Sequence, residues 1–291
     1  MKWIQLLVSG ITVGSIYSLV ALGYLSIYRT SRIVNMAQGA FIMFGGLLTY
    51  SFLKQFGLPF WLSAILGVAC VIVLGVVIYL VVLKPLIKTS LGTIIMATIA
   101  LSIVFENVAL LVWGGYGKSL PAFTGDGALF IGKVAIFRQY LWVIGMLILI
   151  VVGLWALNRF TRTGKQMIAT ANNPAAASLS GVRTGRMIIL AFVISAVIGA
   201  VGGIAFTPIQ ETYYLSGGVY ALSGFVAAVL GGWGSTSGAV VGGVVLGVIE
   251  SFASGVLPAG YQSAIAFAIL ILVLYFRPTG LLGLPQSEGE V

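Results

Sequence analysis

The chain has 291 residues, of which 60% are hydrophobic and only 7% are charged, with a formal net charge of +9. An average soluble domain carries about 25% charged residues, so this composition excludes a soluble fold and predicts an all-α protein that crosses a membrane several times. The basic residues lie mainly in short loops between apolar runs, which indicates membrane topology and not nucleic-acid binding.

The first half of the chain contains five apolar runs that are long enough to cross a membrane. A helix rises ~1.5 Å per residue and the hydrocarbon core is ~30 Å thick, so about 20 residues suffice for one span. The runs cover residues 4–28, 33–53, 58–83, 91–113 and 141–158. Residues 114–138 contain Gly, Pro and mixed charges, and we expect an external loop with partial order there.

The second half contains runs at residues 187–206, 237–256 and 262–276, and a shorter, glycine-rich run at 217–232. The shorter run is either a thin span or a re-entrant half-helix, which needs protein or a watery cavity to cover its backbone. We expect one membrane domain over residues 1–291 with about 8–10 transmembrane helices. With nine spans and an external N-terminus, ten basic residues lie inside and five outside, which predicts that the loop at about 159–186 is cytoplasmic.

Glycine pairs spaced by four residues occur in four places within these runs. Such pairs let two helix backbones approach closely in a membrane. They predict that the first run and two runs of the second half pack tightly against neighbouring helices. The pairs are Gly10 and Gly14, Gly199 and Gly203, Gly238 and Gly242, and Gly243 and Gly247.

Few polar side chains lie at membrane depth, and each is costly unless it faces protein or water. The candidates for lining a translocation pathway are Asn35, Gln38, Ser102 and Asn107. For Asn35 and Gln38 the alternative, which we favour, is hydrogen bonding between helices. Glu106 is either a coupling carboxylate or a hydrogen-bonded structural group, and for Glu250 snorkelling or pairing is a sufficient explanation.

The longest polar and basic interruption of the apolar sequence is at residues 161–185. Within it Asn173 suits a helix N-cap, Pro174 the first helical position and Gly181 the left-handed residue after the end. These signals predict a helix of under two turns, which is marginal alone in water and therefore favours docking onto a partner. The docking segment comprises Asn172, Asn173, Pro174, Ala175, Ala176, Leu179 and Gly181. The alternative is a surface turn that only links two membrane helices, and the residues leave both open.

The same segment carries a resemblance to a known family. A small-residue run, Asn-Asn-Pro, three alanines and Leu-Ser-Gly-Val resemble the cytoplasmic coupling loop of ATP-binding-cassette (ABC) importer permeases, in particular the H-type permeases for branched-chain amino acids. Four further stretches agree: GITVGSIYSLVALGY from Gly10, NMAQGAFIMFGG from Asn35, VLGGWGSTSGAVVGGVVLGVIE from Val229 and FRPTGLLGLP from Phe276. The resemblance covers the whole chain, but the family often has histidine and an acidic residue where this chain has Gln38 and Ala40.

The resemblance implies a permease subunit that translocates branched-chain or related small amino acids across a bacterial or archaeal plasma membrane. It also implies the partners: a second, similar permease subunit, two cytoplasmic ATPases that hold ATP and magnesium, and an external substrate-binding protein. Membrane lipids surround the chain, and we expect it to bind no cofactor itself, because its sequence contains no Walker A motif.

Two other classes of function are compatible with a membrane protein. An ion-coupled secondary transporter of a small polar solute would place Glu106 or Glu250 in a proton or sodium site. An enzyme would need catalytic groups at membrane depth, yet the chain has no histidine and its one cysteine, Cys70, lies in an apolar run. We therefore expect no catalytic residues and no metal site. An ABC permease explains both the short helix and the lack of an ATP site, so it is the function we favour.

Overall fold

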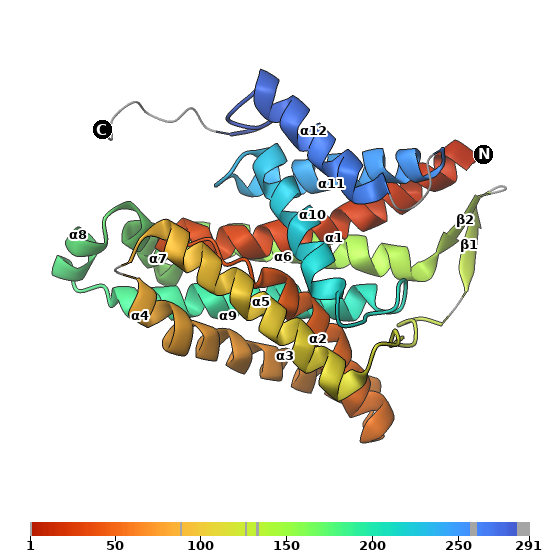
Figure 1. Ribbon diagram of the computed structural model, residues 1–291, viewed down its shortest axis with the longest axis horizontal. Coiled ribbons are helices and arrows are strands. Elements are labelled where there is room, and N and C mark those ends of the chain that lie inside the picture. The colour runs from red at the N-terminus through yellow and green to blue at the C-terminus, as the bar shows by residue number, and fades with distance from the viewer. Residues whose placement is uncertain (1, 88, 126, 132–133, 257–260, 284–291) are drawn as a thin grey trace.

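The computed structural model describes residues 2–87, 89–125, 127–131, 134–256 and 261–283 of an elongated bundle of helices (Figure 1). Two small elements mark its opposite ends: the short helix α8 (Pro174–Leu179) at the left of Figure 1, and the hairpin of β1 (Ala128–Ile131) and β2 (Val134–Phe137) at the right. The N-terminus lies at the hairpin end, and the last described residues return toward the α8 end.

Six helices of the described residues are long and apolar enough to cross a membrane. The third predicted span continues through a π-helical turn, so α3 (Phe60–Val77), η2 (Ile78–Leu83) and α4 (Lys84–Leu86) form one rod. The other five are α1 (Lys2–Ser31), α5 (Leu91–Trp113), α6 (Arg138–Phe160), α9 (Thr184–Phe206) and α11 (Thr236–Ser254). These helices confirm a helical protein that crosses the membrane several times.

Three shorter helices complete the bundle, and the first residues of two of them, Gln38 of α2 and Ser216 of α10, are buried in the protein. They are α2 (Gln38–Tyr50), which continues as the π-helix η1 (Ser51–Gln55), α10 (Ser216–Gly231) and α12 (Gln262–Phe276). The 16 residues of α10 rise only ~24 Å, less than the hydrocarbon thickness. Most of α10 is buried, and the first turns of α10 and α2 touch where Gly39 meets Gly217. Protein therefore covers the backbone of this short helix.

The beginning of the second predicted span differs from the expectation, because residues 32–37 are not helical. Arg32, which follows the last residue of α1, has φ +59°. Residues other than glycine rarely adopt this backbone conformation. The Asn35 side chain then accepts a hydrogen bond from the backbone N–H of Ala37 at 3.2 Å. A continuous apolar run therefore contains a sharp break, after which the helix starts only at Gln38.

The segment at residues 114–138, which we expected to be an external loop with partial order, contains the small hairpin. Its antiparallel strands pair Ala128 with Phe137 and Leu129 with Ile136. Both strands are built from β-branched, aromatic and other apolar residues, which favour extended structure. The hairpin is an addition to the helical architecture and leaves the class unchanged.

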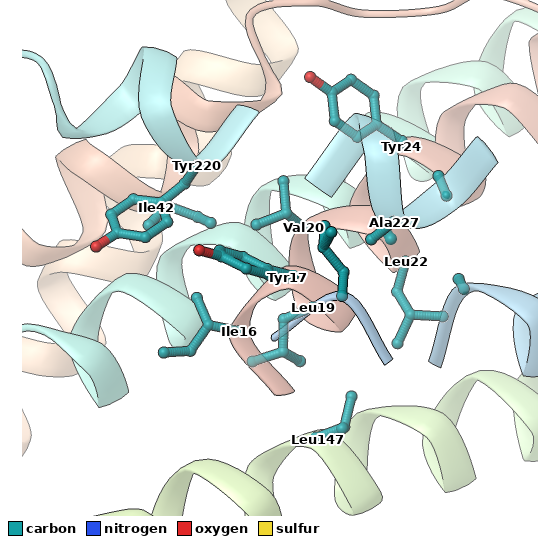
Figure 2. Packing of buried hydrophobic residues seen from close by; sticks show 14 of the residues in the cluster. Ile16, Tyr17, Leu19, Val20, Leu22, Tyr24, Ile42, Leu147, Tyr220 and Ala227 are labelled. Atoms are coloured by element: carbon teal, nitrogen blue, oxygen red, sulfur yellow. The ribbon is translucent and has the colours of Figure 1, made fainter. Parts of the chain in front are cut away.

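The core surrounds α1, which runs through the middle of the bundle and packs against α11, α9, α10 and α6. Ile16, Leu19 and Val20 are fully buried, and Figure 2 shows side chains of α10 and α6, Tyr220 and Leu147, converging on them. Because neighbours surround α1 on all sides, nearly every residue from the middle of the helix onward is buried and no polar stripe is visible in its sequence.

Glycines decide how closely α1 and α11 approach. The backbone of Gly14 lies against Gly243 and Gly247, so a Cβ atom at any of the three would collide with the facing helix. On another side of α11, Gly238 and Gly242 lie against the backbone of α10. The remaining predicted glycines behave in the same way: Gly10 packs on α11, and Gly199 and Gly203 pack on α2.

Candidate functional site

The most sharply defined structure beyond the ends of the membrane spans is the short helix α8 (Figure 1). Its first turn is fixed by Asn173, whose side-chain oxygen accepts a hydrogen bond from the backbone N–H of Ala176 at 3.0 Å. Pro174 occupies the first helical position, where its missing N–H removes no helical bond. The chain therefore enters α8 in a defined direction.

The end of α8 is fixed as firmly as its beginning. Gly181 has φ +82°, and its N–H donates to the carbonyl oxygen of Ser178 at 3.0 Å. The next N–H, of Val182, donates to the carbonyl oxygen of Ala177, also at 3.0 Å. This pair of bonds is the Schellman arrangement, which requires a left-handed residue between helix and loop. A helix of six residues is thus held at both ends.

The outer face of α8 is apolar and bare in the described structure. The side chain of Leu179 is 92% exposed, and Pro174, Ala175 and Ala176 are exposed beside it. Only Ala177 is buried, and it anchors the helix to the rest of the loop. An exposed leucine beside exposed alanines forms an apolar patch outside the spans, and such patches mark sites of contact with a partner protein.

A second helix, α7 (Arg162–Asn172), supports α8, and the sequence analysis missed it. The hydroxyl of Thr161 caps this helix by accepting a hydrogen bond from the N–H of Gly164 at 3.0 Å. Gly164 packs directly against the backbone of α6, and Met167 and Thr170 are buried. The spacing of these three residues, i, i+3 and i+6, places them on one helix face and was the available signal. The loop is a pair of packed helices and not one helix in a flexible linker.

Gln38 is fully buried where α2 begins. Its side-chain oxygen lies 2.6 Å from the Ser195 hydroxyl of α9, which also lies 2.9 Å from the carbonyl oxygen of Gly23 on α1. The Gln38 amide nitrogen donates to the Ser195 carbonyl oxygen at 3.4 Å. These contacts join three helices, which is the arrangement of the interhelical alternative.

Of the other three candidate pathway residues, only Asn35 lies beside Gln38. Asn35 is 1% exposed, and its amide nitrogen has no partner among the described residues. Ser102 is half-buried on α5, whereas Asn107 on the same helix is exposed and its side chain donates to the Ile103 carbonyl oxygen at 2.8 Å. The structure thus separates a buried pair at the start of α2 from an outward-facing pair on α5.

The two carboxylates at membrane depth have different surroundings. Glu250 is 4% exposed and accepts a hydrogen bond of 2.7 Å from the hydroxyl of Tyr17 on α1, so it pairs and does not snorkel. Glu106 is half-buried on α5 beside Gly218 of α10. Within the described residues, neither carboxylate has a lysine or arginine partner, and no three His, Cys, Asp or Glu residues gather as a metal site would require.

Comparison with known proteins identifies relatives along the whole chain. Residues 6–274 match the family model described as branched-chain amino acid transport system, permease component. The high-affinity branched-chain amino acid transport system permease protein LivH of Escherichia coli K12 is 31% identical over 303 residues, covering 98% of this chain and 97% of its own. BraD of Pseudomonas aeruginosa, of the same description, is 32% identical over 301 residues with the same coverage.

More distant matches also occur. The ribose import permease protein RbsC of Escherichia coli K12 is 24% identical over 270 residues, covering 89% of this chain and 81% of its own. The solved structure of PsaBC from Streptococcus pneumoniae in complex with Fab covers 96% of this chain at 14% identity. Its TM-score of 0.45 is too low for a comparison helix by helix.

Proposed function

Since the chain belongs to the family of branched-chain amino acid transport system permease components, we propose that it is the permease subunit of an ABC importer. It translocates branched-chain or related small amino acids across a bacterial or archaeal plasma membrane, and partner ATPases supply the energy. The observation that carries this proposal is α8, a helix fixed at both ends that presents the exposed Leu179 outside the membrane spans.

Docking of two cytoplasmic ATPases onto α8 explains why so short a helix is rigid. A movement of the ATPases can change the permease only if the contact transmits force and binds differently in the two states. The caps at Asn173 and Gly181 and the support from α7 supply that stiffness. The α8 end of the bundle is then the cytoplasmic end, in agreement with the positive-inside rule.

The exposed face of α5 supports a second, homologous permease subunit as partner. Leu111 is 85% exposed on this face and Met96 69%, and apolar side chains of this kind tolerate lipid. Asn107 is exposed among them and Glu106 is half-exposed, and such groups are costly in hydrocarbon. A partner permease that covers α5 removes this cost, and the cargo passes between the two subunits.

The likeness extends to a sugar importer, the ribose permease, at 24% identity. The cargo class therefore rests on the more similar relatives, LivH and BraD, which are amino-acid permeases. An external binding protein that delivers the amino acid accounts for selectivity. This chain offers few charged groups at membrane depth that would grip a zwitterion.

The ion-coupled alternative is not favoured. That alternative places Glu106 or Glu250 in a proton or sodium site, and such a carboxylate must exchange its partner during transport. The Glu250 carboxylate is enclosed and held by Tyr17, and Glu106 lies on the face that a second permease subunit covers in our proposal.

The test is uptake of radiolabelled leucine by proteoliposomes that contain the permeases, the ATPases and the binding protein. Uptake should require internal ATP and survive ionophores that collapse proton and sodium gradients. The variants Glu106→Gln and Glu250→Gln preserve volume and hydrogen-bonding oxygen, so each should retain at least about half of the ATP-driven uptake. Uptake driven by an ion gradient without ATP, and lost in either variant, would establish the secondary transporter instead.

A further inference from the structure

A basic cavity of about 490 Å³ lies between the end of the α3–η2–α4 rod and the start of α9. Three of its lining side chains carry positive charge: Lys84 from the rod, Arg183 from the N-cap of α9 and Arg186 from its first turn. Its lining also includes the apolar side chains of Leu80 and Ile189. We propose that this basic cavity binds the phosphate headgroup of an anionic phospholipid in the membrane leaflet at the α8 end.

The charge of the basic cavity suits a phosphate group. All three cationic side chains are exposed, and the carboxylates that the structure describes, Glu106, Glu211 and Glu250, lie on α5, in the loop before α10 and on α11. Arginine side chains bind phosphate oxygens through paired N–H groups, while lysine contributes a mobile point charge. The positive charge at this point is therefore available for an external anion.

The position of the basic cavity at the ends of two membrane spans favours a lipid over a dissolved anion as its ligand. Lys84 and Arg186 lie at the ends of two membrane spans, where headgroups lie. Leu80 is one turn further into the membrane and is 42% exposed, and its neighbours Val77 and Val81 on the same rod are 47% and 67% exposed. A phospholipid places its phosphate at the cations and its acyl chains along this bare apolar face. Basic pockets between helices at the membrane surface are suited to lipid headgroups.

An acidic segment of a partner ATPase is the competing occupant, since Ser178 of α8 and Gly181 of the docking segment also line the basic cavity. An ATPase from the aqueous side would meet the cations, but Leu80 and Ile189 of the same cavity lie on membrane spans, where apolar side chains meet acyl chains. A lipid contacts both the cations and the apolar face. The headgroup site is independent of which cargo the permease carries.

The test compares the retention of lipid and of the ATPases by the purified transporter, which contains the full-length permease and its ATPases, in native mass spectrometry. The probes are dioleoyl phosphatidylglycerol, dioleoyl phosphatidylcholine and inorganic phosphate. The triple variant Lys84→Gln, Arg183→Gln, Arg186→Gln is matched by a control that removes three exposed cations elsewhere in the coupling loop: Arg159→Gln, Arg162→Gln, Lys165→Gln. Each cation near an anionic surface contributes roughly fivefold in affinity, so the triple variant should bind phosphatidylglycerol about a hundredfold more weakly than the control.

The wild-type protein should prefer phosphatidylglycerol to phosphatidylcholine, and the control variant should keep that preference. Equal retention by the triple variant and the control would overturn the proposal. Binding of inorganic phosphate as strong as that of the lipid would also overturn the proposal. A triple variant that keeps the lipid and loses only the ATPases would overturn it as well. If the triple variant is not monodisperse, Lys84→Gln alone should weaken phosphatidylglycerol about fivefold, and an unchanged affinity there contradicts the site.

Discussion

At the scale of single residues, the absence of a side chain decides the packing of the central helices. Gly14 of α1 and Gly243 and Gly247 of α11 bring two backbones into direct contact. In a membrane the helices gain little from hiding apolar surface, so close van der Waals packing carries a large share of their association. A methyl group at this contact removes that packing and adds strain.

The first prediction concerns this contact. Gly14→Val should lower the melting temperature of the purified protein in detergent, because an added side chain in a filled interface costs about 1–3 kcal/mol or more. The matched control is Gly145→Val on α6, where a Cβ atom meets nothing within 4 Å. Thermal unfolding followed by circular dichroism measures both variants. Equal melting temperatures would show that α1 and α11 can separate without loss.

At the scale of elements, α8 was predictable because each of its signals is local. An Asn before a Pro, a run of alanines and a Gly at the end specify the helix within ten residues, and the structure has the cap at Asn173 and positive φ at Gly181. The starts of α2 and α7 were harder to predict from the sequence. The break before α2 depends on Arg32 adopting φ +59° inside a continuous apolar run, and the register of α7 depends on Gly164 meeting α6.

The pathway candidates show the same limit of local reasoning. The polar type of Gln38 marked it as unusual at membrane depth, but its bonds to Ser195 and proximity to Gly23 depend on residues about 157 and 15 positions away in the chain. Likewise, Tyr17 and Glu250 are separated by 233 positions. Sequence patterns identify such residues, whereas tertiary packing decides what they contact.

The second prediction tests the docking face of α8. Leu179→Asp should leave the permease in the membrane but reduce co-purification of the ATPases at least about tenfold, because it puts an unpaired charge into an apolar contact. The control is Ala169→Asp, which adds the same charge to an exposed position of α7. Pull-down of the tagged permease with quantified ATPase measures the effect. Normal assembly of Leu179→Asp would place the docking surface elsewhere.

At the scale of the whole molecule, the bundle contains two similar groups of helices, and α6 belongs to neither. Each group has a long helix, a short buried helix and two further membrane helices: α1, α2, the α3–η2–α4 rod and α5 in the first, and α9, α10, α11 and α12 in the second. The packing repeats as well, since α1 lies on α11 as α9 lies on α3, and α2 meets α10. In Figure 1 α1 runs away from the hairpin end while α9 runs toward it, so the two groups cross the membrane in opposite directions.

This arrangement fixes the sidedness of each loop that the structure describes once one of them is assigned. The last prediction therefore concerns orientation, with single cysteines in a background where the exposed Cys70 is replaced by Ala. Tyr116→Cys lies near the hairpin end, in a position where the native side chain is 86% exposed, and an impermeant maleimide should label it in intact cells. Ala169→Cys on α7 should be labelled only after the membrane is permeabilised. The positive-inside bias requires this result, because α7 and α8 share the end of the bundle that carries Lys84, Arg183 and Arg186. The reverse labelling pattern would turn α8 outward and remove it from any contact with cytoplasmic ATPases.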